Sequence, residues 1–99
     1  MIFNIAFDTS SRKVSLTSVT DRDVDDTYAI QTTYDGTLRE GYTAYCVLEN
    51  GTNIELVDGY AEIPVFDSYL VLQLKFVWED ERFYSMNLLV LKESDIIKS

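Results

Sequence analysis

Three aspartates with alternating spacing are the residues of this chain closest to a metal-binding pattern. Asp21, Asp23 and Asp25 are spaced like the first ligands of a calcium-binding loop. The sixth position of such a loop requires Gly and here holds Asp26, and the twelfth requires a bidentate Glu and here holds Thr32. The sequence therefore predicts a solvated acidic loop without a specific metal site, and these three aspartates are its calcium candidates.

The sequence contains candidate nucleophiles and paired carboxylates, but it lacks the residues that would make them catalytic. Cys46 and Ser85 are candidate nucleophiles, but the chain has no His to activate either of them. Asp35 and Glu40 flank one loop and form a candidate acid–base pair, yet no sequence signature of a cleft accompanies them. We therefore predict no catalytic residue, no cofactor and no enzymatic activity.

Tyrosines give a more specific indication of binding. Tyr28, Tyr45, Tyr69 and Tyr84 lie in strand-like stretches, and tyrosine is enriched at interfaces, where its ring packs and its hydroxyl meets water. One interpretation is a contact surface for another chain. The alternative is that these tyrosines are ordinary half-buried strand residues.

A loop with one aromatic and two acidic side chains is the candidate ligand site. Tyr34, Asp35 and Glu40 lie within residues 34–41, a loop that contains two glycines. A carbohydrate- or receptor-binding domain would need exposed aromatics near loop carboxylates, and these three residues meet that description. A structure with Tyr34 exposed in a cleft would favour this function over assembly.

Composition and charge exclude several classes of partner. The 99 residues suit one domain with a single core, and a hydrophobic fraction of 46% predicts a globular chain. The net charge of −9 argues against nucleic acid and anionic membrane surfaces, because both require a cationic footprint. No segment approaches the length of a membrane span, and the first residues do not resemble a signal peptide. We therefore expect a soluble protein made in the cytoplasm.

The most regular stretch, residues 69–91, alternates side chains as a β-hairpin does. One face of its first strand is apolar without interruption, which predicts packing on the main core; it carries Leu70, Leu72, Leu74, Phe76 and Trp78. Residues 79–82 form the predicted turn. The return strand, residues 83–91, becomes apolar on both faces toward its end, which predicts a strand covered on two sides.

Shorter strands are predicted at residues 2–7, 13–19, 27–33, 42–49, 52–57 and 60–63. Asn50-Gly51 predicts a two-residue hairpin turn, in preference to the glycosylation site that the same residues with Thr52 would match. Asp58-Gly59 repeats the turn signal, so residues 42–63 are expected to form a meander. The single cysteine, Cys46, lies in one of these strands and is expected to be a small buried apolar residue.

These elements predict an all-β fold, an Ig-like antiparallel β-sandwich of about seven or eight strands. Residues 1–91 form one domain in this prediction. Residues 92–99 change character and are expected to be a connector or the start of a helix, which Ser94 would cap.

The order of features in the second half resembles that of a known group of proteins. TAYCVLENGTNIEL is a strand pair with a polar turn, DGYAEIP is a short strand, and SYLVLQLKFVWEDERFYSMNLLVL is a long hairpin followed by a connector. In this order the chain resembles the immunoglobulin-like N-terminal modules of bacteriophage baseplate and tail-fibre proteins, notably the baseplate upper protein family. The resemblance covers residues 42–97 and includes no invariant motif, so it transfers no binding residue.

This resemblance implies a non-enzymatic structural module of a phage virion, which anchors a baseplate, tail fibre or head appendage by protein–protein contact. Its expected partners are other virion proteins, with further copies of itself as candidate partners, and without nucleic acid or membrane. Its location would be the virion, after synthesis in the host cytoplasm. The alternative function is a carbohydrate- or receptor-binding β-sandwich domain.

Overall fold

The computed structural model describes residues 1–20, 27–80, 83–85 and 87–92, and in them the chain forms nine β-strands and no helix. The strands are β1 (Ile2–Asp8), β2 (Lys13–Thr20), β3 (Tyr28–Asp35), β4 (Thr43–Leu48), β5 (Asn53–Leu56), β6 (Tyr60–Ile63), β7 (Tyr69–Val77), β8 (Phe83–Ser85) and β9 (Leu89–Lys92). From β1 to β7 their bounds lie within two residues of those predicted, because the period-two alternation of side chains marks them well.

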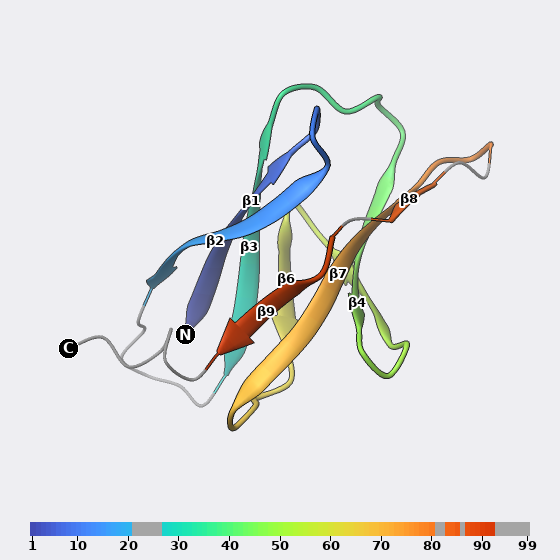
Figure 1. Cartoon of the computed structure of the whole chain (residues 1–99). Coiled ribbons are helices and arrows are strands. Elements are labelled where there is room, and N and C mark those ends of the chain that lie inside the picture. The colour runs from blue at the N-terminus through green and yellow to red at the C-terminus, as the bar shows by residue number, and fades with distance from the viewer. Residues whose placement is uncertain (21–26, 81–82, 86, 93–99) are drawn as a thin grey trace.

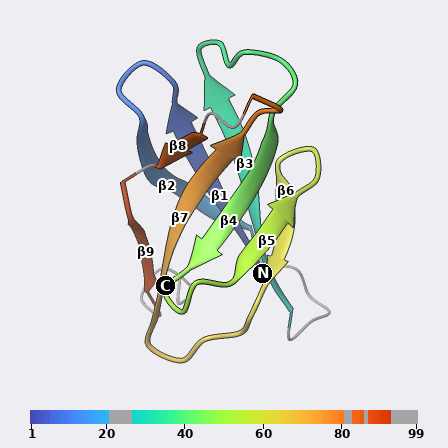
Figure 2. The ribbon, with the colours of Figure 1, turned by 90° about the vertical axis from the view of Figure 1, so that its right-hand side faces the viewer.

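The strands form two sheets, which appear as two facing layers in Figures 1 and 2. Sheet I has the order β2-β1-β3-β6. Sheet II has the order β5-β4-β7, and β8 and β9 pair with successive parts of the free edge of β7. Neighbouring strands are antiparallel except β1 and β3, which run parallel. The predicted all-β, Ig-like sandwich is confirmed, with nine strands in the described residues where about seven or eight were predicted and with one parallel pair in place of a fully antiparallel arrangement.

The core lies between the inner faces of the two sheets. Alternate residues of β1 and β7 are fully buried there: Phe3, Ile5, Phe7, Leu72, Leu74 and Phe76. Cys46 of β4 is a free, buried thiol, as expected. Each large apolar side chain buried in this way contributes about 1.5–3 kcal/mol before the entropy of ordering is subtracted.

The predicted meander over residues 42–63 is wrong in its third strand. β4 and β5 pair in sheet II, but β6 pairs with β3 in sheet I. The turn between β5 and β6 is the tight one expected, since Asp58 and Gly59 have φ angles of 53° and 80°. Val57 and Tyr60 exchange two backbone hydrogen bonds across it, but they form a single isolated bridge. The chain therefore changes sheets at this turn.

The predicted return strand, residues 83–91, is two strands in the structure. Ser85 pairs with Lys75 and Leu89 pairs with Leu72, so four steps along one strand oppose three along β7. One residue is left over, which breaks the ladder as a bulge does and reverses the alternation between β8 and β9. β9 extends to Lys92, and the rest of the predicted connector, residues 93–99, lies outside the described residues.

The turn between β4 and β5 has three residues instead of the predicted two. Leu48 donates its N–H to the carbonyl of Thr52, and its own carbonyl accepts the N–H of Gly51, both at 2.9 Å. Only Gly51 takes a positive φ, 90°, so a type I turn is followed by a left-handed glycine. Asn50 acts through its side chain, because its Oδ1 accepts the N–H of Thr52 at 3.0 Å.

Candidate functional site

The four tyrosines predicted to form a contact surface lie in two different environments. Tyr28 and Tyr84 are half-buried at the core: Tyr28 packs against Phe3, and Tyr84 contacts the Trp78 ring edge-on at 5.4 Å. Tyr45 and Tyr69 lie on the outer face of sheet II, because they alternate with core residues of β4 and β7. Only these two tyrosines share one surface.

The three residues of the predicted ligand loop are not brought together. Tyr34 is half-buried and faces the core, where its ring lies 5.7 Å from that of Phe76. Asp35 is exposed at the end of β3, and the alternation of the strand directs it to the other side of sheet I. Glu40 is exposed in the loop before β4, next to Arg39.

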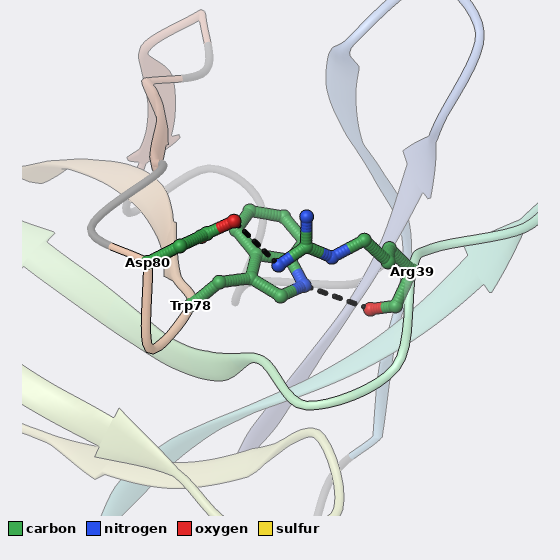
Figure 3. A network of polar contacts seen from close by, with 3 residues as sticks. All are labelled: Arg39, Trp78 and Asp80. Carbon is green, nitrogen blue, oxygen red and sulfur yellow. Dashed lines mark hydrogen bonds and ion pairs between the residues drawn. The ribbon is translucent and has the colours of Figure 1, made fainter.

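A clasp of Arg39, Trp78 and Asp80 holds that loop against the end of β7 (Figure 3). The indole Nε1 of Trp78 donates to the carbonyl of Arg39 at 3.0 Å, and the Arg39 guanidinium forms a 3.0 Å ion pair with Asp80. The guanidinium also lies 5.5 Å from the centre of the Trp78 ring. The clasp joins two segments about forty residues apart, so its first role is to fix the fold.

An apolar patch lies on the outer face of sheet II, and we call it the outer patch. Its members are Val47, Tyr69, Val71, Leu88 and Val90. Val71 pairs with Val90 across β7 and β9, and Val47, Val71 and Leu88 line one shallow hollow of about 380 Å³. Tyr69, Leu88 and Val90 are 56%, 62% and 42% exposed, which is unusual for large apolar side chains gathered on one face.

Charged side chains of opposite sign border the outer patch, the negative ones at β4 and β5 and the positive ones on β7 and β9. Tyr45 pairs with Glu55 of β5 on one side and with Lys75 of β7 on the other. Farther along, Tyr69 pairs with Lys92 of β9, and Glu49 follows β4 in the turn that borders the same hollow. Glutamates therefore mark the β4–β5 side and lysines the β7–β9 side.

The outer face of sheet I differs in chemistry. It carries hydroxyl and amide side chains: Asn4, Ser15, Ser18, Thr20, Gln31 and Thr33. Several are joined to each other, since the amide of Asn4 donates to the hydroxyls of Ser18 and Thr20 at 3.1 and 2.8 Å. This face suits contact with water, so the two faces of the sandwich are unlike.

The edge strands offer little room for a further strand. β5 and β6 have four residues each, and the opposite edge of sheet II is divided between β8 and β9. β2 is longer, but its register against β1 shifts between Asn4 and Ile5, which leaves an extra residue in β2. Short and bulged edges hinder strand addition. A partner is therefore better accommodated on a face than on an edge.

A second hollow, of about 500 Å³, lies where the chain leaves β5 and crosses to β6. Thr32 and Tyr34 of β3 border it from sheet I, and Tyr42 and Ala44 border it from sheet II. The turn at Asp58-Gly59 and the acidic residue Glu55 complete its lining, together with Thr43 and Leu56. We call this space the inter-sheet hollow.

Two tyrosines that line this hollow, Tyr34 and Tyr42, interact with each other. Tyr34 and Tyr42 stand nearly perpendicular, with ring centres 6.2 Å apart. Burial, together with the charge and the hydrogen bond of Tyr42, raises the pKa of Tyr34 to about 12. Tyr34 therefore remains a neutral hydrogen-bonding group at physiological pH.

Sequence reasoning did not assign the outer patch or the inter-sheet hollow. The apolar residues on both faces of residues 88–91 predicted a strand covered on two sides. That prediction is wrong for the described residues, because Leu88 and Val90 are exposed, but the same pattern marks the outer patch. No comparable signal marked the hollow, since Thr32 and Tyr42 become neighbours only when the two sheets pack.

The described residues hold no group of three His, Cys, Asp or Glu that is suited to a metal ion. The calcium candidates Asp21, Asp23 and Asp25 lie outside those residues. Nor does the described part of the chain include a helix long and apolar enough to cross a membrane. Compared with protein-family models, with curated proteins and with solved structures, the chain matches none.

Proposed function

We propose that this chain is a non-enzymatic structural module that assembles through the outer face of sheet II. The outer patch is the observation that carries this proposal. Exposed apolar side chains gathered on one face are typical of protein contact sites, because burying apolar surface drives association. The resemblance of residues 42–97 to phage baseplate and tail-fibre modules supports a virion as the setting, with other virion proteins as further partners.

The partner that fits the outer patch is a second copy of this chain. A two-fold axis parallel to the strands, between β4 and β7, would lay strands β4 and β5 of one copy over β7 and β9 of the other. Glu49 and Glu55 of each copy would then face the side of the other that carries Lys75 and Lys92. Opposite charges at the rim orient such a contact, and the apolar centre supplies its affinity.

Charge reversal on the two sides of the patch tests this arrangement. Lys75→Glu with Lys92→Glu makes the face wholly acidic, and Glu49→Lys with Glu55→Lys makes it wholly basic. Each variant alone places like charges opposite each other, so we expect self-association at least about tenfold weaker than in the wild type. An equimolar mixture of the two variants restores complementarity and should form a heterodimer.

Asp35→Lys with Glu62→Lys is the control matched to Glu49→Lys with Glu55→Lys, because it makes the same change of charge on the outer face of sheet I. Light scattering and sedimentation over a concentration series measure the mass of each sample. We expect the control to associate like the wild type. Variants that weaken association no more than the control, or a mixture that stays monomeric, would rule out this interface.

A further inference from the structure

The turn between β4 and β5 contains the one Asn-Gly pair of the sequence, Asn50-Gly51. Both residues are exposed. Asparagine side chains are chemically labile, and most of all before glycine, because no Cβ of the next residue hinders its backbone nitrogen from reaching the side-chain carbon Cγ. The other three asparagines, Asn4, Asn53 and Asn87, precede isoleucine or leucine. Asn50 is therefore the asparagine most open to attack by the nitrogen of the following residue.

The reaction that this pair can undergo is an intramolecular deamidation. The backbone nitrogen of Gly51 loses its proton to a hydroxide ion of the solvent and attacks Cγ of Asn50. The new C–N bond closes a five-membered succinimide, and the bond from Cγ to the side-chain nitrogen breaks, so ammonia leaves. Water then opens the ring at either carbonyl and gives an aspartate or an isoaspartate at position 50. No oxidant or reductant takes part.

The folded turn keeps the two reacting groups apart. Asn50 takes the third position of the type I turn, where ψ is about 0°, so the nitrogen of Gly51 eclipses the backbone nitrogen of Asn50. Ring closure requires it to eclipse Cβ instead. The N–H of Gly51 also donates to the carbonyl of Leu48 at 2.9 Å, and Oδ1 of Asn50 accepts the N–H of Thr52 at 3.0 Å. Rotation about ψ of Asn50 breaks both hydrogen bonds.

We propose that Asn50 is the deamidation site of this chain and that local opening of the β4–β5 turn sets the rate. Two hydrogen bonds stabilise the closed turn, so the folded chain should react at least about fivefold more slowly than the unfolded chain. An exposed turn can open without unfolding of the sheets that it joins. This inference goes beyond the proposed assembly function and does not depend on it.

The two products change the turn in different ways. An aspartate keeps an oxygen that can accept the N–H of Thr52, and it adds one negative charge beside Glu49. An isoaspartate inserts a methylene into the main chain between Leu48 and Gly51, which lengthens the segment that their 2.9 Å hydrogen bond closes. Deamidation therefore either adds charge to the turn or alters its backbone.

The test compares two measurements on the same backbone nitrogen. The full ¹⁵N-labelled chain is incubated at mildly alkaline pH, folded in buffer and unfolded in urea. Peptide mapping by mass spectrometry follows deamidation at each asparagine, with Asn50→Asp as the standard for the aspartate product. Hydrogen exchange of the Gly51 amide in the folded chain measures how often the turn opens. The nucleophile and the exchanging donor are one N–H group, so one opening controls both rates.

We expect Asn50 to react faster than Asn4, Asn53 and Asn87 in both samples. We also expect folding to slow the reaction by the factor by which it slows exchange of the Gly51 amide, within about threefold. In urea, Gly51→Ala should slow the reaction at Asn50 several-fold, because its methyl group hinders ring closure. The matched control Gly59→Ala should leave that rate unchanged, since the same substitution lies outside the Asn-Gly pair.

Four outcomes would overturn the proposal. Faster reaction at another asparagine would overturn the site, and a rate in Gly51→Ala equal to that in Gly59→Ala would overturn the chemistry. Slowing by folding of less than about fivefold, or by a factor more than about threefold away from that of Gly51 exchange, would overturn the control by the turn. None of these outcomes bears on the mass measurements, so this site and the assembly face fail or stand separately.

Discussion

The chain passes from sheet II to sheet I at the turn that contains Gly59. This turn requires glycine, because a side chain at Gly59 would collide with β3. Its φ is 80°, and a Cβ built on it would lie 2.6 Å from the carbonyl oxygen of Thr32. The carbonyl of Gly59 also accepts the N–H of Thr32 at 2.8 Å. The turn therefore packs directly on the backbone of β3 because glycine occupies it.

Replacing Gly59 by Ala should destabilise the protein more than the same change at Gly51. Gly51 has a φ of 90° but nothing within 4 Å of a built Cβ, so Gly51→Ala costs only the left-handed backbone, about 1–2 kcal/mol. Gly59→Ala adds the clash with Thr32, and we expect at least about 1 kcal/mol more. Urea unfolding of both variants measures the difference in the free energy of unfolding. Equal losses of stability would contradict the prediction, because they would show that the turn shifts to relieve the clash at no cost in free energy.

The thiol of Cys46 links stability to alkaline pH. Burial raises the pKa of Cys46 from 9.0 to about 12, so the folded state holds its proton more tightly than the unfolded state does. This stabilisation is complete below pH 9 and is lost as pH rises toward 12. We expect the free energy of unfolding to fall above pH 9 by up to about 1.4 kcal/mol per pH unit for this group.

Cys46→Ala is the control for that slope. The variant loses some core packing at every pH, but between pH 9 and 10 its unfolding free energy should be flatter than that of the wild type. Above pH 10 both proteins should decline, because Tyr34 also has a raised pKa, about 12. A wild-type curve that is flat from pH 9 to 10 would contradict the assignment.

Among the elements, the loop of residues 36–42 depends on the clasp at the end of β7. Trp78 is 5% exposed, and the ion pair of Arg39 and Asp80 is half-exposed on both sides. Burial makes the indole hydrogen bond the stronger of the two contacts, since exposed ion pairs contribute about 0–1 kcal/mol.

Trp78→Phe should therefore cost more than Asp80→Ala. We expect about 1–3 kcal/mol for the first, which leaves the Arg39 carbonyl without its donor and a gap in the core. We expect at most about 1 kcal/mol for the second. Urea unfolding of both variants tests the order, and a larger loss in Asp80→Ala would mean that the ion pair holds the loop.

Local side-chain patterns predict most of the strands but not all of their pairings. Alternation is a property of each segment, so β1 to β7 follow from the sequence. β6 joins sheet I because it pairs with β3, which is about thirty residues away in the chain. The turn residues Asp58-Gly59 do not indicate which sheet the following strand joins. The break between β8 and β9 depends on a one-residue mismatch with β7, which is visible only once the register is known.

For the whole molecule, the two outer faces of the sandwich are unlike, and the proposed assembly uses the outer face of sheet II. Tyrosine content indicated a contact surface, and Tyr45 and Tyr69 do lie on the outer face of sheet II. Tyr28 and Tyr84 pack at the core instead, because the alternation of their strands faces them inward. Composition shows only that tyrosines are abundant, whereas the face on which each tyrosine lies follows from register and sheet order.

The mass of the purified wild-type chain in solution, measured by light scattering over a concentration series, tests the assembly claim most directly. We expect a two-fold mass that appears with rising concentration, disappears in Lys75→Glu with Lys92→Glu, and returns when that variant is mixed with Glu49→Lys and Glu55→Lys. A wild-type monomer at every concentration up to about 1 mM, where even a weak dimer forms, would contradict assembly through sheet II.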